Sequence, residues 1–474
     1  MTSEVQSASA APRTPTSRAD AHRPERASET PLLLLIACAE PTPSPDSATS
    51  DTATVEDTAS DTDLAGPPAV HLPLTSLDAA SLGIVVNTDD PLSAAIAADY
   101  AAAHGIPPEH IVELSLGGGT DLTAESFAVA RATLDATFGD DVQALLLTFY
   151  KPYRVSCMAT SAAFALGFDA QWCQSGPPCR TTAPSPLYDT ETVTPWSDHG
   201  VRPTMMLSGP SREAAQAVIA RGLAAQASYP GPESAATPGP TDVILLRTSD
   251  AARSTRWDDM ERAAQRFDPV AGLRVTYRDA SANPADELYT SATGLLGYQT
   301  GLTWVSGLDT VTFAPGALAD HLTSFGGVLD GSAGQMPATA WLDAGATASY
   351  GTAIEPCNYP QKFPRPTVLW SRYFRGATAV EAYWASVEWP GEGNFVGDPL
   401  ARPFGHRASW EDGVLTIRTT WPDRRAAYRI EAADSEQGPW ETVADALEGG
   451  RDHTTHTWSV PDARRAHYRL VAAE

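Results

Sequence analysis

The chain has 474 residues, 42% of them hydrophobic, which is enough apolar material for two or three packed domains. Its formal charge at pH 7 is −26. Such a charge argues against binding to nucleic-acid phosphates and against an electrostatic patch for anionic lipids. It is typical of a solvated surface that keeps a secreted protein soluble.

The N-terminus, residues 1–38, is predicted to be disordered and to contain a lipoprotein signal. A polar stretch without apolar periodicity leads into the short apolar run Pro31-Leu-Leu-Leu-Leu-Ile-Ala-Cys38. The end of that run, Leu35-Ile-Ala-Cys38, resembles a bacterial lipobox, in which signal peptidase cuts before a cysteine that carries lipid. The run is too short to span a bilayer. The alternative is a chance apolar run before an isolated thiol.

A tether is predicted over residues 39–72. This segment is rich in Ser, Thr, Asp and Pro and has almost nothing to bury, so we expect it to be disordered. After a lipidated cysteine it would connect a membrane anchor to folded domains. The expected localisation is therefore the bacterial cell envelope, with the exported protein held on a membrane through Cys38.

Order is expected from residue 74, where strand and helix patterns alternate. The predicted helices cover 91–105, 123–138 and 254–267, and the predicted strands cover 81–87, 110–114, 142–149, 242–247 and 273–277. This alternation predicts βαβ units on a mostly parallel sheet. In such sheets, function resides in the loops at the carboxyl ends of the strands.

The sequence pattern changes over residues 405–474, where short predicted strands are separated by turn residues. The expected strands are 414–418, 428–431, 440–443, 456–458 and 467–471, which is typical of an all-β module. The pattern Tyr428-Arg-Ile-Glu, Gly438-Pro-Trp440 and Tyr468-Arg-Leu resembles a fibronectin type III-like β-sandwich.

Residues 81–404 resemble an uncharacterised bacterial family known mostly from genomes with the PEP-CTERM/exosortase sorting system. The collinear matches include VVNTDDPLS (85–93), LLLTFYKPYRVSCMATSAAFALGFDAQWC (145–173) and EAYWASVEWPGEGNFVGDPLARPF (381–404). That family has no assigned activity, so this resemblance transfers no functional residue.

The end of the core also resembles the gingipain-type cysteine peptidases. The resemblance rests on Gly345-Ala346 opening a strand that ends Ser349-Tyr-Gly351, on Glu381-Ala382 in a helix, and on Phe395-Val-Gly-Asp-Pro-Leu400. It implies that residues 74–404 form a caspase/gingipain-like α/β domain, a mostly parallel sheet flanked by helices. In that family the catalytic His follows one strand in a His-Gly turn, and the Cys ends the next strand, before a helix and a Gly-Ala strand.

The stretch 315–364 concentrates candidate catalytic residues. His321 lies where the resemblance implies the peptidase histidine, although Leu322 rather than glycine follows it. Cys357 could act as its nucleophile, but it follows the Gly-Ala strand instead of preceding the expected helix 335–342. The slot before that helix holds Ser332, a second candidate nucleophile. A structural histidine hydrogen-bonded to a loop backbone is the alternative.

We expect these residues to share a rim at the strand ends with possible ligand-binding groups, namely Asp320, Ser324 and Glu355. The expected arrangement places His321 in a concave site, with the Cys357 sulfur out of its reach. Acidic residues elsewhere at predicted strand ends, Asp89-Asp90 and Asp398, could bind a metal or charged substrate, or serve as N-cap and turn residues. The two lysines, Lys151 and Lys362, fall in motif-dense stretches.

Cysteine pairing is predicted from the number of thiols. With Cys38 lipidated, Cys157, Cys173, Cys179 and Cys357 remain, and an even number in an exported protein predicts two disulfides. Cys173 and Cys179 would close a small loop, which leaves Cys157 to pair with Cys357. A zinc site is the alternative, but the spacing is not Cys-x₂₋₄-Cys and no His pair accompanies it. We expect no metal and no cofactor.

Three functions follow from these patterns. The leading hypothesis is a non-catalytic relative of the gingipain-type peptidases that binds a protein or peptide ligand in the cell envelope. The second is an active cysteine endopeptidase that uses His321 with Cys357. The third is an adhesive surface protein whose sandwich binds carbohydrate or protein. Thiol counting distinguishes the first two, because a nucleophilic Cys357 cannot sit in a permanent disulfide.

Overall fold

The structure is a computed structural model that describes residues 66–173, 179–227, 241–267, 273–419, 427–448 and 456–472. The predicted lipidation site Cys38 and the tether up to residue 65 lie outside the described residues. Their export and anchoring roles stay predictions.

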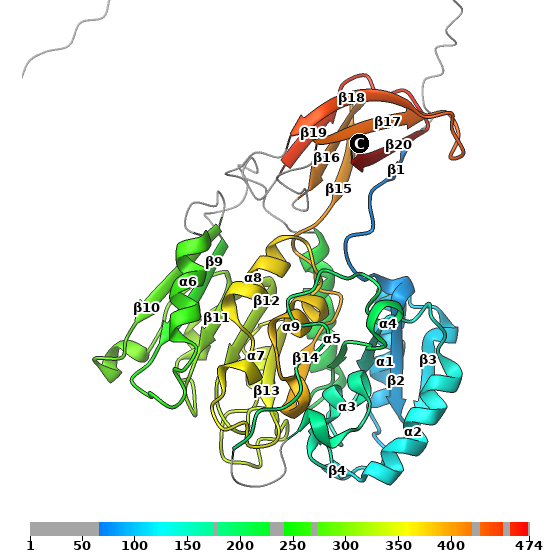
Figure 1. Cartoon of the computed structure of the whole chain (residues 1–474). Coiled ribbons are helices and arrows are strands. Elements are labelled where there is room, and N and C mark those ends of the chain that lie inside the picture. The colour runs from blue at the N-terminus through cyan, green and yellow to red at the C-terminus, as the bar shows by residue number, and fades with distance from the viewer. Residues whose placement is uncertain are drawn as a thin grey trace, which may run out of the picture. The chain divides into compact units, whose positions relative to one another are not determined.

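A ten-stranded sheet forms the centre of the α/β domain, in the order β10-β9-β11-β12-β13-β14-β8-β5-β2-β3 (Figure 1). Neighbouring strands are parallel from β10 to β13 and from β8 to β3, whereas β14 is antiparallel to β13. The predicted mostly parallel α/β sheet is confirmed. The strands are β2 (Leu82–Asn87), β3 (Ile111–Leu114), β5 (Ala144–Leu147), β8 (Thr204–Met206), β9 (Thr241–Arg247), β10 (Leu273–Asp279), β11 (Leu295–Thr300), β12 (Phe313–His321), β13 (Ala348–Thr352) and β14 (Gly393–Gly397).

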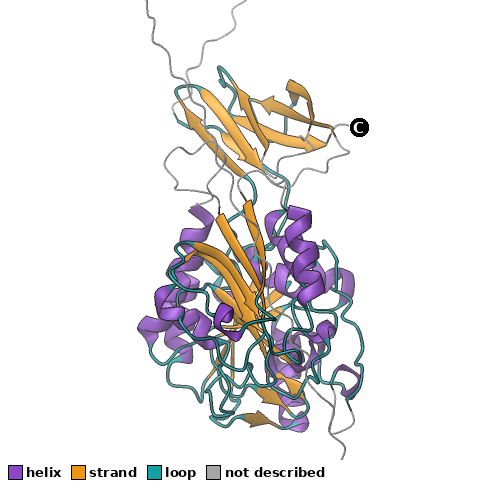
Figure 2. Ribbon diagram, turned by 90° about the vertical axis from the view of Figure 1, so that its left-hand side faces the viewer, coloured by secondary structure: helices purple, strands orange, loops and turns teal. Residues whose placement is uncertain are grey.

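Helices cover both faces of this sheet (Figure 2). Their apolar faces and the fully buried strands β2 and β5 form one large core, which explains why these strands read as continuous apolar runs. The helices are α1 (Ser93–His104), α2 (Ala124–Thr137), α3 (Thr160–Leu166), α4 (Pro195–His199), α5 (Arg212–Ala227), α6 (Trp257–Phe267), α7 (Thr339–Asp343), α8 (Pro366–Phe374) and α9 (Ala379–Ser386).

Local sequence signals set the ends of α1. The Asp90 side chain accepts a hydrogen bond from the Leu92 amide at 2.9 Å in the turn before the helix. Gly105 ends the helix in the left-handed conformation, with φ of 73°, which costs glycine no steric penalty. These signals hold α1 directly after β2.

The order in which strands join the sheet reverses at two places. The chain places β3 on one side of β2 and β5 on the other, and it places β10 and β11 on opposite sides of β9. Parallel sheets bind ligands beyond the carboxyl ends of strands at such crossover points. Both places are therefore candidate binding sites.

Several elements differ from the sequence predictions. The strand that leads to His321 is β12, and the helix expected over 335–342 is the shorter α7. A small three-stranded sheet joins β4 (Asp121–Leu122), β6 (Arg154–Val155) and β7 (Met158–Ala159).

The C-terminal strands form two sheets around a shared core, so the predicted β-sandwich is confirmed. The specific resemblance to fibronectin type III stays a prediction. One sheet has the order β1-β20-β17-β18 and the other β15-β16-β19. The strands are β15 (Arg407–Glu411), β16 (Val414–Thr419), β17 (Ala427–Ala433), β18 (Glu441–Glu448), β19 (His456–Val460) and β20 (His467–Ala472).

The sandwich includes a strand from the segment predicted as tether. β1 (Ala69–His71) pairs in parallel with β20, and Val70 and Leu72 pack on the sandwich core. His71 Nε2 lies 3.2 Å from Nδ1 of His467. The expectation of disorder up to residue 72 is wrong for these residues, because β20 supplies backbone partners that the local sequence does not reveal.

No helix in the described part of the chain combines the length and the apolar character that a membrane crossing needs.

Candidate functional site

His321, the expected catalytic base, ends β12 as a buried structural group. Its side chain is 1% exposed, Nε2 lies 3.1 Å from the Met336 carbonyl oxygen, and Nδ1 accepts a hydrogen bond from the Trp341 indole at 2.9 Å. Burial lowers the pKa of His321 to about 3. Both ring nitrogens are occupied and the ring does not reach solvent, so the expected concave site around His321 is not present.

Asp320, beside it, is held in an equally buried network. Its carboxylate accepts hydrogen bonds from Arg256 Nη1 and Gln299 Nε2, each at 2.7 Å, and both Asp320 and Arg256 are 1% exposed. Burial raises the pKa of Asp320, and the Arg256 charge opposes the rise. Asp320 therefore serves the interior and not a ligand-binding rim.

The crossover point beside β9 is filled by the chain itself. Thr248 Oγ1 donates to the Gly301 carbonyl at 2.6 Å, and Ser254 Oγ lies at hydrogen-bond distance, 2.9 Å, from Thr248 Oγ1. A β-carbon on Gly301 would lie 1.9 Å from the Arg253 carbonyl oxygen, so glycine is required for this close approach. We call this region, residues 248–254 together with Gly301, the closed edge.

The remaining candidates are not assembled around His321. Ser332 is exposed and its amide donates to Asp330 Oδ1 at 3.1 Å, in a turn. Glu355 accepts a hydrogen bond from the Cys357 amide at 2.8 Å, and the Ser324 carbonyl accepts one from Thr352. These contacts lie within loops or join a loop to the end of β13, and none involves the imidazole of His321.

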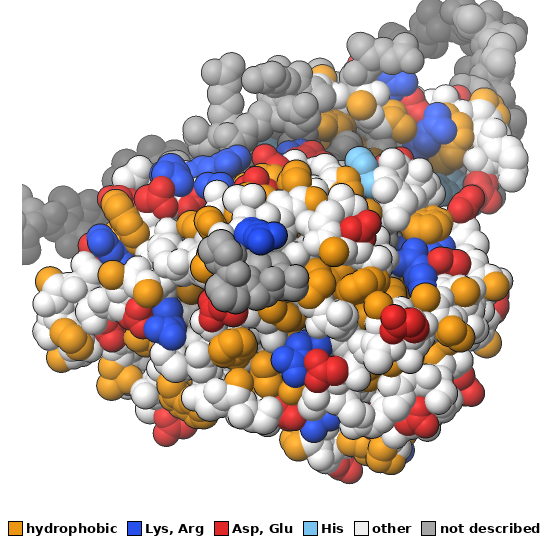
Figure 3. Space-filling view, turned by 60° about the horizontal axis from the view of Figure 1, so that its bottom comes forward, with side chains coloured by type: hydrophobic (Ala, Val, Ile, Leu, Met, Phe, Trp, Pro, Cys, Tyr) orange, Lys and Arg blue, Asp and Glu red, His pale blue; other side chains and the backbone are white. Residues whose placement is uncertain are grey.

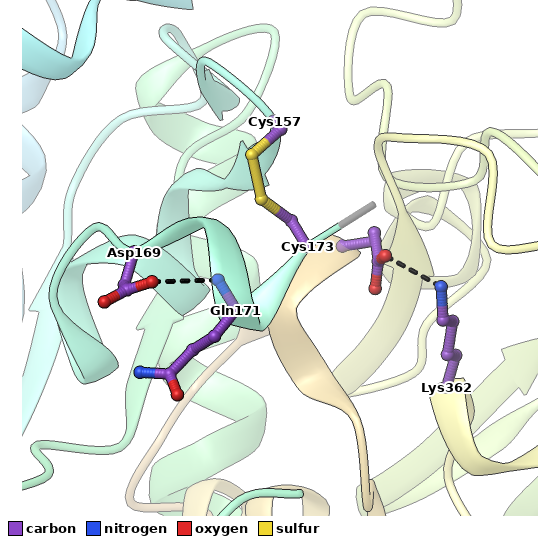
Figure 4. Close-up of a disulfide and its surroundings, with 6 residues drawn as sticks. Cys157, Asp169, Gln171, Cys173 and Lys362 are labelled. Atoms are coloured by element: carbon purple, nitrogen blue, oxygen red, sulfur yellow. Dashed lines mark hydrogen bonds and ion pairs between the residues drawn. A yellow bond between two sulfur atoms is a disulfide. The ribbon is translucent and has the colours of Figure 1, made fainter. Parts of the chain in front are cut away.

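All four expected cysteines form disulfides, but the predicted pairing is wrong. The bridges join Cys157 to Cys173 (Figure 4) and Cys179 to Cys357. Cys173 and Cys179 are close in sequence, but each pairs with a cysteine brought near by the fold. With the bridge intact, the Cys357 sulfur is not available as a nucleophile.

An open cleft of about 810 Å³ lies beyond the carboxyl ends of β2, β5 and β8. It coincides with the crossover point beside β2, and its volume is typical of ligand sites. We call it the strand-end cleft. Its lining comprises Asp89, Asp90, Pro91, Leu92, Gly118, Tyr150, Lys151, Ser208, Gly209, Pro210, Ala214, Ala217, Val218, Arg221, Leu329, Asp330, Pro337, Thr339, Leu342 and Asp343.

Asn87, the last residue of β2, fixes the loops around this cleft. Its amide nitrogen donates to the carbonyls of Gly117 at 3.0 Å and Lys151 at 3.1 Å. Its amide oxygen accepts hydrogen bonds from the Leu116 and Asp89 amides. One buried side chain thus ties together the segments that follow β2, β3 and β5.

Several charged groups of the cleft have an ion-pair or hydrogen-bond partner. Lys151 Nζ pairs with Asp330 at 2.9 Å. The Gly117 amide and the Ser115 hydroxyl donate to Asp89 at 2.7 and 2.8 Å, and the Gly117 hydrogen bond contributes most to lowering the pKa of Asp89. The cleft lining contains four aspartates but only one lysine and one arginine, so its net charge is negative.

Three further ionisable residues of the lining have shifted pKa values. Burial raises the pKa of Tyr150 above its ordinary range and lowers that of Arg221, whose Nη2 donates to the carbonyls of Leu342 and Ala346. Burial likewise raises the pKa of Asp343, and the nearby Arg221 charge opposes this. The lining of the cleft thus combines these ionisable groups with apolar residues such as Leu342 and Val218.

Two other residues singled out from the sequence are structural. Lys362 and Glu392 form a buried ion pair at 2.8 Å. Asp398 is fully buried and accepts hydrogen bonds from the Tyr100 hydroxyl at 2.8 Å and the Leu400 amide at 2.9 Å. Neither lines the strand-end cleft.

The molecular face shown in Figure 3 carries acidic and basic side chains interspersed. Within the described ranges, no group of three or more His, Cys, Asp or Glu side chains is arranged to hold a metal ion.

Part of the strand-end cleft could be found from the sequence. Asp89, Asp90 and Lys151 follow predicted strands, which is the signal for strand-end residues. Asn87, Arg221 and Asp343 were missed, because a strand terminus and two helices do not show which cavity they face.

Comparisons with known proteins give a faint structural similarity. No family model matches the chain, and no curated protein matches it significantly. Among solved structures, a protease is similar with a TM-score of 0.39 and 10% identity, over 84% of this chain and 98% of that chain. The complex of Porphyromonas gingivalis RgpB pro- and mature domains is similar with a TM-score of 0.39 and 11% identity, over 80% and 99%.

Proposed function

We propose that the protein is an exported ligand-binding protein of the bacterial cell envelope without peptidase activity. The observation that carries this proposal is the contrast between the strand ends: the cleft beyond β2, β5 and β8 is open, whereas His321 is enclosed with both ring nitrogens occupied. A general base needs a nitrogen within hydrogen-bond reach of a substrate proton. The Cys179–Cys357 bridge further supports the absence of a cysteine nucleophile.

The ligand of the strand-end cleft is a small polar molecule that is neutral or positively charged. The four aspartates disfavour an anion, which would also compete with Asp330 for Lys151. An apolar body can rest on Leu342, Val218 and Tyr150 while polar groups meet the rim.

A binding experiment with a steric block tests this assignment. Ala217 is exposed and lines the cleft, so Ala217→Trp should fill it without disturbing the core. We expect ligands found by thermal-shift screening of amines, sugars and short peptides to lose saturable binding to this variant. Val129→Trp, at a residue 70% exposed and outside the cleft lining, is the matched control. Ligands that bind both variants equally well would contradict the assignment.

Peptidase activity is tested separately. The purified protein should leave casein and a mixed peptide library intact, and thiol titration should detect no free thiol at Cys157, Cys173, Cys179 or Cys357. Cleavage that persists in a Ser332→Ala variant but stops in Cys357→Ser would restore the endopeptidase hypothesis.

Membrane attachment is tested at Cys38. The lipobox and the Ser/Thr/Asp/Pro-rich segment after it support attachment through a lipidated Cys38. Cys38→Ala should move the protein from the membrane fraction to the soluble fraction of its own cells. A wild-type protein that is already soluble and carries no lipid would refute the anchor.

A further inference from the structure

A second cleft, of about 420 Å³, is lined by four arginines. Arg266 lies in the last turn of α6, Arg365 precedes α8, and Arg372 and Arg375 lie at the carboxyl end of α8. The whole chain has 58 acidic residues against 32 basic ones, so this concentration reverses its average charge locally. We call this site the arginine cleft.

The carboxylates that line the arginine cleft leave an excess of positive charge. Asp189 accepts from Arg372 at 2.7 Å, and the single carboxylate of Glu191 is shared by Arg372 and Arg375. Arg365 pairs with Asp259, outside the lining, at 3.1 Å. Four arginines therefore face three carboxylates, and the cleft keeps an excess of one positive charge.

Arg266 has no carboxylate partner among the described residues. Its Nη2 donates to the Ser371 hydroxyl oxygen at 3.3 Å, which leaves the hydroxyl hydrogen of Ser371 able to donate to a ligand. The side chain of Arg266 is exposed, and that of Arg375 is 40% exposed. Exposed ion pairs such as Arg375–Glu191 hold their geometry weakly, so these guanidinium groups can turn toward a ligand at little cost.

We propose that the arginine cleft binds a phosphate-bearing ligand. A phosphate monoester carries a charge of about −1.5 to −2 at pH 7 and is attracted by this excess of positive charge. Its oxygens accept the paired N–H groups of arginine in a bidentate arrangement. The chemistry is the same for a soluble phosphomonoester and for the headgroup of an anionic phospholipid, and the experiment separates the two sources.

Calorimetric titration of the purified protein with glycerol 3-phosphate tests the soluble source, and co-sedimentation with phosphatidylcholine vesicles containing phosphatidic acid tests the lipid source. We expect saturable binding to at least one probe. Arg266→Gln and Arg375→Gln should each weaken it about tenfold, the loss of one charge-assisted contact. Arg274→Gln, which removes an exposed, ion-paired arginine on β10 outside the cleft lining, should leave it unchanged.

Three results would overturn the proposal: no saturable binding of either probe, equal weakening by Arg274→Gln, or loss of binding in Ala217→Trp. The last would move phosphate recognition to the strand-end cleft, so failure here is distinguishable from failure of the proposed function. Circular dichroism of each variant confirms that the surface substitutions leave the fold intact.

Discussion

At the crossover beside β9, residues 248–254 and Gly301 pack together beyond the strand ends, whereas beside β2 the corresponding space is a cleft of about 810 Å³. Nearby on the closed edge, polar groups point inward, as Asp320 does toward Arg256. At the strand-end cleft, Asn87 hydrogen-bonds backbone carbonyls of the surrounding loops, and the space beyond the strands stays open. A crossover in a parallel sheet thus offers a place for a ligand, and the adjoining loops decide whether it stays open.

Breaking the buried ion pair near the closed edge should have the largest effect. Arg256→Ala leaves Asp320 in the interior without its charged partner, so we expect the free energy of unfolding to fall by about 3–5 kcal/mol. Urea unfolding measures it. The double variant Arg256→Met, Asp320→Leu should lose clearly less free energy of unfolding, because it leaves no buried charge without a partner. A cost below about 1 kcal/mol for Arg256→Ala would show that this interior is more hydrated than its burial indicates.

The Cys179–Cys357 bridge joins segments 178 residues apart, before β8 and after β13. Replacing both cysteines with serine should lower the free energy of unfolding by about 2–5 kcal/mol, measured by thermal unfolding with and without a reductant. Non-reducing peptide mapping gives the pairing directly. A peptide that links Cys173 to Cys179 would contradict the fold of both loops.

The buried His321 should make stability depend on pH. Its pKa is about 3 in the folded protein against an ordinary value of 6.5, so the unfolded chain binds the proton more tightly between these values. Stability is therefore complete above about pH 6.5 and falls on acidification at about 1.4 kcal/mol per pH unit. In the His321→Gln variant, the urea unfolding midpoint should no longer show this part of the pH dependence between pH 4 and 7. The exposed His199, changed to Gln, should preserve the slope; equal slopes in all three proteins would be inconsistent with a neutral buried His321.

The rim of the strand-end cleft should tolerate substitution best. The side chains of Lys151 and Asp330 are 42% and 24% exposed, so Lys151→Met should alter the free energy of unfolding by less than about 1 kcal/mol. The same residue provides a chemical test. An amine-reactive ester should label Lys151 in the folded protein and spare Lys362, which is buried with Glu392. Labelling of Lys362 under native conditions would contradict the closed packing around it.

The sequence predicted the sheet better than the site. Buried strands such as β2 and β5 are continuous apolar runs, and proline and glycine mark the ends of α1, so these elements follow from local pattern. The surroundings of His321 depend on Trp341 and Met336, which the fold brings to its ring from later segments. The predicted disulfide pairing was wrong for the same reason. Cys173 and Cys179 are close in sequence, but the fold pairs each with a cysteine from another segment.

The pairing of β1 with β20 has a consequence for how the chain is made. Ala69 opposes His467, so β1 finds its partner in a strand that is synthesised almost 400 residues later. The sandwich cannot complete its four-stranded sheet before β20 (residues 467–472) is synthesised, whereas every strand of the ten-stranded sheet has been synthesised by Gly397. The α/β domain therefore has the opportunity to fold first during translation, and a fragment that begins at residue 405 would lack one strand of its own sheet.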